Sequence, residues 1–340
     1  MRLAGLTVRA LEELLESRTR AVAAAKWIYG PRPWSDAMPA AVDGLGAAAW
    51  SKLRTTCDPS DVRIAARSTA TDGTIKLVMA VDGGAVESVM IPTPRRSTIC
   101  VSSQIGCTRS CTFCATATLG FRRNLRADEI VAQFLIARSV APASAPAKNV
   151  VFMGMGEPMD NLDEVLTAVE ILTQSPAPQL GHAQVTVSTS GVLPGMKRFL
   201  AESKCSLALS LNGTTDAQRL AVMPQTKSWP IDALLALLRA HPDRVHFIEY
   251  VMFDGINDSD DDAVRIIELL RGINARLNLI PHNPIAESPL CASPRERIEG
   301  FRRVTVAAGI RTMIRWPRGS DITAACGQLV GLRNEKQRLL

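Results

Sequence analysis

Long apolar runs, a secretion signal and internal repeats are all missing from this sequence of 340 residues. No run approaches the roughly 18 consecutive apolar residues that suggest a membrane-spanning helix. The first twenty residues hold too many Glu and Arg side chains to form the apolar core of a secretion signal. With 46% hydrophobic and 21% charged residues, the chain is predicted to be a cytoplasmic globular protein with no membrane partner.

Histidine is scarce, and the four histidines show no spacing typical of metal ligands, so no metal site is expected on them. The eight cysteines are not expected to form a disulfide framework, because a long cytoplasmic chain stays reduced. Three of them, Cys107, Cys111 and Cys114, fall within eight residues. This density indicates a metal or redox site.

The formal net charge of +6 is a modest basic excess. It fits a nucleic-acid partner, because phosphates attract clustered Lys and Arg side chains. Many proteins without such a partner have the same balance, so the charge alone leaves both alternatives open.

The first 95 residues are predicted to form a small module of helices and β-strands. Apolar residues at helical spacing predict a helix or helix pair over Leu6–Tyr29, and a short helix follows over Leu45–Leu53. Two alternating segments, Thr74–Val81 and Ala85–Ile91, are joined by Asp82-Gly83-Gly84, which predicts a β-hairpin.

From residue 96 to 332, short β-branched runs alternate with longer helical patterns, and residues 333–340 form a tail. This alternation predicts an α/β fold of parallel strands with outer helices. About six or seven units in this length favour a partial (βα)6-type barrel, because a full eight-unit barrel takes about 250 residues. The expected strands are Thr98–Ser102, Asn149–Met153, Gln184–Ser188, Ser206–Leu211, Arg244–Met252, Arg276–Ile280 and Ile310–Ile314, and the expected helices include Ala127–Arg138, Leu162–Leu172, Ile231–Ala240, Asp260–Leu270 and Pro294–Ala307.

The cysteine cluster follows the first of these strands, where barrel enzymes place their chemistry. Its spacing, C-x3-C-x2-C, lets three thiolates bind three irons of a four-iron cluster and leave the fourth iron open. The alternatives are structural zinc and buried cysteines without a ligand. Structural zinc usually requires four ligands, and no fourth Cys or His lies nearby in the sequence.

With Phe113 before the last cysteine, the cluster resembles that of the radical S-adenosylmethionine superfamily. Longer strings resemble the RlmN/Cfr family of RNA adenine methyltransferases, from about Lys26 to about Gly331. These strings are Cys100-Val-Ser-Ser-Gln-Ile-Gly-Cys107, Met153-Gly-Met-Gly-Glu-Pro158, Ser188-Thr-Ser-Gly-Val192, Asn278-Leu-Ile-Pro-His-Asn-Pro284 and Gly319-Ser-Asp-Ile-Thr-Ala-Ala-Cys-Gly-Gln-Leu329. The resemblance implies one [4Fe-4S] cluster on Cys107, Cys111 and Cys114, and a radical S-adenosylmethionine barrel.

The resemblance also implies three catalytic residues. Cys326 matches the family's methyl carrier, and Cys100 matches the thiol that later breaks a protein–RNA link by forming a disulfide. Glu87 matches the proposed proton acceptor. In isolation, Cys326 and Cys100 could equally be small buried hydrophobes, and Glu87 could be a solvated strand residue. The remaining Cys57, Cys205 and Cys291 match no catalytic position and are expected to be structural.

The S-adenosylmethionine pocket is implied by the same matches, and two molecules of the cofactor are expected per turnover. Asn212 stands where His is usual in the family, so its contact with the cofactor would differ from the family's usual one. Ordinary turn chemistry is the alternative role for each polar residue of this set. The matching residues are Gly156, Glu157, Ser188, Ser210, Leu211, Asn212 and Asn283.

The family's activity implies methylation of adenosine carbon-2 in 23S rRNA, and in tRNA, by a monomer that receives electrons from a flavodoxin or ferredoxin. The alternatives are carbon-8 methylation of 23S rRNA, as in the Cfr branch, and a radical enzyme with a substrate other than RNA. A zinc-binding module without catalysis is the last alternative. Candidate RNA contacts are Arg122, Arg123, Arg126, Arg302, Arg303, Arg315 and Arg318, each of which could instead be solvated or ion-paired.

Overall fold

A ten-stranded sheet organises the computed structural model, which describes residues 1–31, 38–286 and 288–330. The strand order is β1-β2-β3-β4-β7-β8-β9-β10-β11-β12. The strands from β4 to β12 in this order pair in parallel, and β1 to β4 pair antiparallel. The sheet strands are β1 Arg63–Thr69, β2 Ile75–Val81, β3 Gly84–Thr93, β4 Arg96–Cys100, β7 Ala147–Phe152, β8 Val185–Thr189, β9 Ser206–Ser210, β10 His246–Met252, β11 Ala275–Pro281 and β12 Arg311–Ile314.

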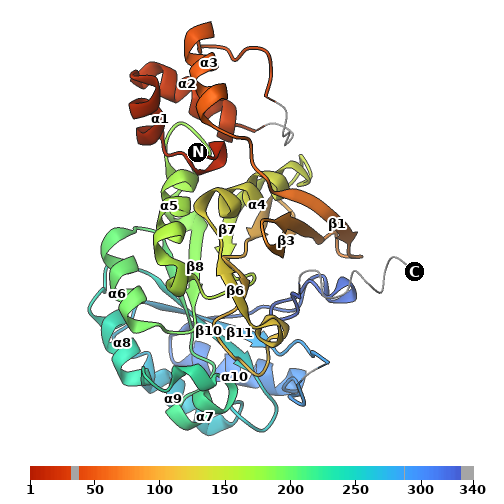
Figure 1. Cartoon of the computed structure of the whole chain (residues 1–340). Helices are drawn as coiled ribbons and strands as arrows, with labels where there is room; N and C mark the ends of the chain where they lie inside the picture. Colours follow the sequence, from red (N-terminus) through yellow and green to blue (C-terminus); the bar gives the residue numbers. More distant parts are fainter. Residues whose placement is uncertain (32–37, 287, 331–340) are drawn as a thin grey trace.

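Helices follow the parallel strands and lie around the outside of the sheet (Figure 1). They are α4 Ala127–Ser139, α5 Leu162–Thr173, α6 Leu193–Glu202, α7 Asp216–Val222, α8 Ile231–Arg239, α9 Asp260–Leu269 and α10 Arg295–Ala307. Seven parallel strands with six intervening helical connections, and no pairing of β12 with β1, make the expected partial barrel. None of the helices in the described residues is long and apolar enough to cross a membrane.

Three N-terminal helices, α1 Val8–Leu15, α2 Arg18–Tyr29 and α3 Ala47–Thr56, sit at one end of the molecule (Figure 1). The Tyr29 hydroxyl donates to the carbonyls of Leu3 and Leu6 inside this group. Arg138 of α4 donates to the carbonyls of Tyr29 and Gly30, at 2.8 and 2.6 Å. These contacts fix the helices to the barrel.

The expected hairpin is present as β2 and β3, and its turn is Asp82-Gly83 because Gly84 already pairs with Val81. Gly83 has a positive φ of 74°, which explains the glycine in this two-residue turn. Both strands continue the barrel sheet through β4. The division expected at residue 95 falls in the turn between β3 and β4 and stays a prediction. The tail 333–340 lies outside the described residues, as do residues 331 and 332.

Every expected strand and helix of the barrel is confirmed to within about two residues at each end, and the helix expected at Leu45–Leu53 ends at Thr56. Sequence analysis missed β1, α6, α7 and a small antiparallel pair, β5 Gln104–Gly106 with β6 Phe121–Asn124. Short 3-10 helices complete the structure at Leu3–Gly5, Ala115–Leu119, Pro158–Asn161, His182–Gln184, Pro224–Thr226 and Ser320–Ile322.

Candidate active site

A cavity of about 170 Å³ opens where the parallel strands end and their loops begin. Most of the residues expected in the site share its lining, although they are spread over more than 200 positions of the chain. These are Cys107, Cys111, Cys114, Gly156, Glu157, Ser188, Ser210, Asn212 and Cys326. The lining does not include four other expected residues, Glu87, Cys100, Leu211 and Asn283. They interact with the site through neighbouring residues.

The three cysteines lie on the loop that β5 and β6 close. The Cys107 amide donates to the Gly120 carbonyl at 3.1 Å, and the Cys107 sulfur accepts from the Arg109 amide at 3.3 Å. Burial raises the pKa of Cys107 to about 12 and raises that of Cys111 as well. The neighbouring cluster thiols add to both shifts. Three partly buried thiols this close together are a donor set that a cationic iron cluster would stabilise as thiolates.

Their arrangement fits a cluster better than a single ion. Among residues 1–31, 38–286 and 288–330, no group of three or more His, Cys, Asp or Glu side chains could hold one metal ion. A four-iron cluster takes one thiolate on each of three different irons, so its ligands need not converge on one point. The three soft donors at one cavity wall therefore suit the iron–sulfur cluster.

Glu157 is a buried carboxylate at the opposite edge of the same cavity. Its two oxygens accept from the amides of Met159 and Ser190, at 3.1 and 2.8 Å. Burial raises the pKa of Glu157, and these hydrogen bonds partly offset the shift. Gly156 before it has a φ of 100°, and a Cβ there would lie 2.6 Å from the Gln104 Cβ. The carboxylate is thus fixed in the cavity lining, where such a group can pair with an ammonium, and the close backbone approach requires glycine at position 156.

The strand ends of β8, β9 and β10 bring further polar groups to the cavity. Ser210 lies opposite Glu249 in the sheet register, and Ser188 comes from the end of β8. The Leu211 side chain is fully buried, and its amide donates to the Glu249 carbonyl at 2.9 Å, so Leu211 can offer only backbone to a cofactor.

Asn212 is held in a left-handed backbone conformation, with a φ of 55°. Its side-chain oxygen accepts from the Val251 amide at 2.8 Å, and its amide nitrogen donates to the Met223 sulfur at 3.1 Å. Asn tolerates this conformation better than most residues. The departure from His therefore has a local structural explanation, because both polar atoms of Asn212 are engaged within the protein.

The loop around Cys326 is held by hydrogen bonds to two consecutive backbone carbonyls. The Asn283 side chain donates to the Cys326 carbonyl at 2.9 Å, so its contact is with the carrier loop. The Ala115 amide, next to Cys114, donates to the Gly327 carbonyl at 2.7 Å. Cys326 therefore lies beside the cluster loop as well as in the cavity wall.

The Cys326 thiol is exposed to the cavity, yet the protein packed around it raises its pKa, and the Glu249 carboxylate adds to this effect. Cys100 is buried at the end of β4. Burial raises its pKa, and proximity to Cys326 is the next cause. Both cysteines are free in the structure. They are near enough to interact electrostatically.

Glu87 is only 2% exposed, which excludes the alternative of a solvated strand residue. One of its oxygens lies 3.4 Å from the Lys76 ammonium nitrogen, and the other accepts from the Val330 amide at 2.9 Å. Its side chain therefore contacts the segment that bears Cys326.

Sequence analysis missed two charged groups of the site. Glu249 lines the cavity, accepts from the Asn278 side chain at 2.7 Å and has its pKa raised by burial. Arg219 is 1% exposed and lies behind the cavity wall. The sequence did contain an indication of Glu249, because it is a charged residue within the otherwise largely apolar strand His246–Met252. Nothing in the sequence around Arg219 distinguishes it from a surface arginine.

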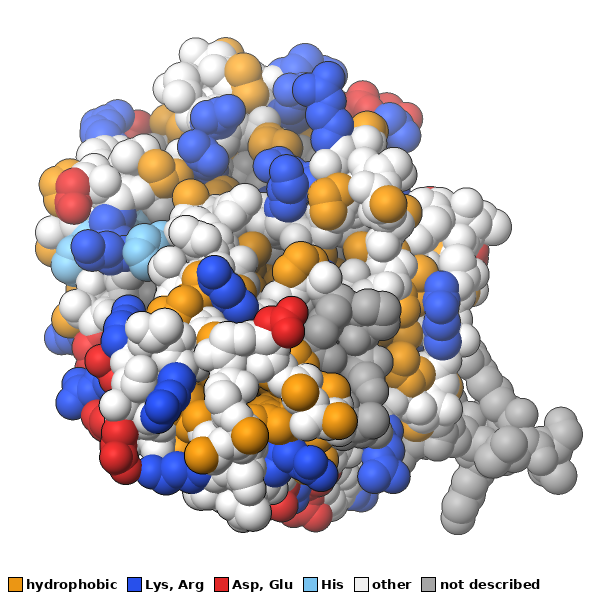
Figure 2. All heavy atoms as spheres, turned by 90° about the horizontal axis from the view of Figure 1, so that it is seen from above, with side chains coloured by type: hydrophobic (Ala, Val, Ile, Leu, Met, Phe, Trp, Pro, Cys, Tyr) orange, Lys and Arg blue, Asp and Glu red, His pale blue; other side chains and the backbone are white. Residues whose placement is uncertain are grey.

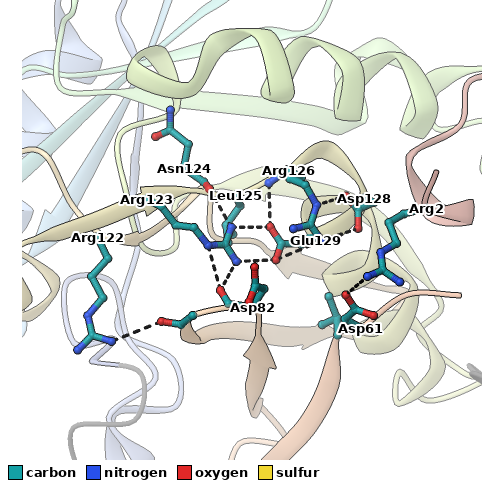
Figure 3. Close-up of polar contacts among 12 residues, drawn as sticks. Arg2, Asp61, Asp82, Arg122, Arg123, Asn124, Leu125, Arg126, Asp128 and Glu129 are labelled. Atoms are coloured by element: carbon teal, nitrogen blue, oxygen red, sulfur yellow. Dashed lines mark hydrogen bonds and ion pairs between the residues drawn. The ribbon is translucent and has the colours of Figure 1, made fainter. Parts of the chain in front are cut away.

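The basic residues expected to contact RNA after the cluster loop are mostly engaged within the protein (Figure 3). Arg123 makes two hydrogen bonds to Glu129, at 2.7 and 2.8 Å, and donates to the Asp82 carbonyl. Arg126 pairs with Asp128 at 2.9 Å. Among the described residues, Arg122 has only a 3.5 Å contact with the Gly83 carbonyl, and its side chain is exposed. Across the face in Figure 2, Lys and Arg side chains are spread out and predominate over Asp and Glu.

Comparison with known proteins agrees with this geometry. The family model of the radical SAM superfamily matches residues 101–267. The chain is 41% identical to a protein of Sorangium cellulosum described as a probable RNA methyltransferase, covering 99% of the chain and 89% of the relative. It is 44% identical to the dual-specificity RNA methyltransferase RlmN of Paracoccus denitrificans, covering 78% and 72%. The crystal structure of a radical SAM methyltransferase from Sphaerobacter thermophilus superposes with a TM-score of 0.89 at 36% identity, covering 97% and 99%.

Proposed function

Because this chain belongs to the RlmN-type family of radical S-adenosylmethionine RNA methyltransferases, we propose that it methylates adenosine carbon-2 in 23S rRNA and in tRNA. The observation that supports this most is the presence of the Cys326 thiol in the same cavity wall as the three cluster cysteines and Glu157. A carrier thiol beside a radical source has a use in methylating an electron-poor ring carbon, which does not attack a sulfonium as an amine would.

In this proposal Cys107, Cys111 and Cys114 hold a [4Fe-4S] cluster, and Glu157 faces the amino group of S-adenosylmethionine. Ser188, Ser210, the Leu211 backbone and Asn212 form the rest of the cofactor wall. When bound, the cluster and cofactor supply a carbon radical and the methyl group. Two cofactor molecules per turnover follow, one as methyl donor and one as radical source.

The residues of the chain carry the methyl group in three steps. The Cys326 sulfur loses its proton and takes the methyl group, and after hydrogen abstraction this carbon bonds to adenine. Glu87 accepts the proton from the modified ring carbon, and the unpaired electron left in the ring would pass back to the cluster. Cys100 then gives up its thiol proton and attacks the Cys326 sulfur. The bond between that sulfur and the transferred carbon breaks, the carbon takes up a proton to complete the methyl group, and a Cys100–Cys326 disulfide remains.

The last step is supported by the proximity of the two thiols, because the Cys326 thiol adds to the raised pKa of Cys100. Burial keeps Cys100 protonated until it is needed. We further propose that the protein acts in the cytoplasm as a monomer and receives electrons from a flavodoxin or ferredoxin, which would also reduce the disulfide.

The test is to express the wild type and Cys326→Ala in a host that lacks its own adenosine carbon-2 methyltransferase, and to analyse nucleosides from 23S rRNA and tRNA by mass spectrometry. We expect 2-methyladenosine with the wild type and none with Cys326→Ala. Cys291→Ala is the matched control, because Cys291 is exposed and outside the cavity lining. Detection of 8-methyladenosine instead would favour the carbon-8 alternative, and unchanged RNA would point to another substrate.

A further inference from the structure

The short helix α7 connects the cluster loop to the cofactor segments. At its carboxyl end, the Val222 carbonyl accepts from the Thr112 amide at 3.0 Å and from the Thr112 hydroxyl at 3.3 Å. Thr112 lies between the cluster cysteines Cys111 and Cys114. The next residue, Met223, accepts from the Asn212 side chain. One turn of helix thus touches two parts of the candidate site.

Arg219 on the same helix reaches two more site segments. Its Nη2 donates to the Ser190 carbonyl, in the loop after β8, and its Nε donates to the Leu211 carbonyl at 3.3 Å. Its Nη1 donates to the Trp229 carbonyl at 3.4 Å. A Cβ on Gly191 would lie 2.6 Å from Arg219 Nη2, so the glycine leaves room for the guanidinium. Each of the three guanidinium nitrogens of Arg219 therefore has a backbone carbonyl as its hydrogen-bond acceptor.

No carboxylate neutralises this buried cation. Within the described parts of the chain, no Asp or Glu oxygen lies within the 4.0 Å of an ion pair with Arg219. Burial lowers the pKa of Arg219 to about 10, which still leaves it protonated at neutral pH. An unpaired buried charge is costly, so a compensating negative charge is to be expected when the site is loaded.

Two of the three negative groups that act on Arg219 belong to the site. Asp216 on its own helix, the Cys111 thiol and the Glu157 carboxylate are the charges that act on it. A cluster bound by three thiolates carries net negative charge, which increases by one when it is reduced. A nearby positive charge favours the reduced form, because net charge is one of the factors that set the potential of an iron–sulfur cluster.

We propose that Arg219 is a positioning residue with two effects: it fixes the Ser190 and Leu211 backbones at the cofactor wall, and its charge makes the cluster easier to reduce. This inference rests on the cluster and cofactor of the proposed function, but it is independent of which RNA or which ring carbon is the target.

The test uses full-length protein with an anaerobically reconstituted cluster, without RNA. The reduction potential is measured by redox titration followed by electron paramagnetic resonance, first without S-adenosylmethionine, and cofactor affinity is measured by equilibrium dialysis. Arg219→Met removes both the positive charge and the three hydrogen bonds of the guanidinium. Arg219→Lys keeps the charge but cannot make the same three hydrogen bonds. Arg244→Met is a matched control, because Arg244 also donates only to backbone carbonyls, those of Leu200, Ser203 and Cys205.

We expect Arg219→Met to shift the potential to a more negative value, and Arg219→Lys and Arg244→Met to stay near the wild type. Both Arg219 variants should bind S-adenosylmethionine about tenfold more weakly or worse, which is the loss of one charge-assisted hydrogen bond. If Arg219→Met fails to take up a cluster, Arg219→Gln provides the neutral comparison. A neutral variant with the wild-type potential would overturn the electrostatic effect, and unchanged cofactor affinity would overturn the positioning effect. Failure to find 2-methyladenosine with the wild type would instead contradict only the proposed RNA target.

Discussion

Lys76 and Glu87 form a buried ion pair that holds both sides of the loop bearing Cys326. The Lys76 ammonium lies 3.4 Å from the Glu87 carboxylate and donates to the carbonyl and hydroxyl of Thr323, each at 3.1 Å. Glu87 accepts from the Val330 amide. The hairpin β2–β3 thus contacts the segment that bears Cys326 three residues before and four residues after this cysteine.

Replacing Lys76 with Met should strongly destabilise the protein, because Glu87 would remain as a buried charge without its partner. We expect a loss of about 3–5 kcal/mol in the free energy of unfolding, measured by urea denaturation. Lys52→Met is the control: Lys52 pairs with Glu16 at 2.8 Å on the surface, and such pairs contribute about 1 kcal/mol or less. Equal effects of the two substitutions would mean that the buried pair does not hold the loop.

Glu87→Gln should preserve the fold but slow the release of methylated RNA. The amide oxygen of Gln can still accept from the Val330 amide, but it cannot accept a proton from the modified adenine. General-base catalysis contributes roughly 10²–10⁴-fold, so a loss of that order is expected in product formation, with accumulation of a protein–RNA link visible on a denaturing gel. Methylation of Cys326 itself, followed by peptide mass spectrometry, should continue. A wild-type rate of RNA methylation would leave Glu87 with a structural role only.

Gly156→Ala should abolish cofactor binding at a modest cost in stability. The new Cβ would lie 2.6 Å from the Gln104 Cβ and 2.8 Å from its backbone nitrogen, at a φ of 100°. Overpacking of this kind costs about 1–3 kcal/mol, and the backbone shift would displace Glu157 from the cavity. Equilibrium dialysis with S-adenosylmethionine and urea denaturation measure the two effects. Gly300→Ala, in helix α10 with its nearest neighbour at 3.6 Å, should leave both unchanged or slightly raise stability.

The sequence was sufficient to predict the barrel because its central strands, such as Ser206–Ser210 and His246–Met252, are largely buried and show as short, mostly apolar runs. Strand β1 was missed because most of its residues, such as Arg63 and Arg67, are exposed and leave no such run. Helix α6 begins with Leu193-Pro194-Gly195, residues that usually indicate a turn, although Pro is well tolerated in the first turn of a helix.

The sequence predicted only those site residues that belong to a recognisable motif. Cys107, Glu157 and Cys326 belong to strings with a family resemblance, and the structure brings them into one cavity. Arg219 and Glu249 act through tertiary neighbours, since their partners lie on other strands and loops, such as Asn278 and Ser190. Local periodicity cannot show which buried charges will face a common cavity, because this depends on the register of the whole sheet.

The surface near the open edge of the barrel provides a test of RNA contact. A groove of about 480 Å³ between α10 and β12 is lined by Arg302, Arg303, Met313 and Trp316, among others. Arg303 has no ion pair within 4.0 Å among the described residues. An arginine beside an exposed aromatic ring suits a phosphate next to an unpaired base. Trp316 follows β12 at its carboxyl end, which is the end of the sheet where the cavity lies.

Arg303→Ala should weaken RNA binding and reduce the steepness of its salt dependence. Loss of one phosphate contact lowers the slope of log K against log salt by about 0.7–0.9, measurable by fluorescence anisotropy with a labelled 23S rRNA hairpin at several salt concentrations. Arg198→Ala is the control, because Arg198 on α6 already pairs with Asp163 and Glu202 at 2.6 Å. An unchanged slope for Arg303→Ala would place the RNA elsewhere, and Arg122, exposed beside the hairpin turn, would be the next position to substitute.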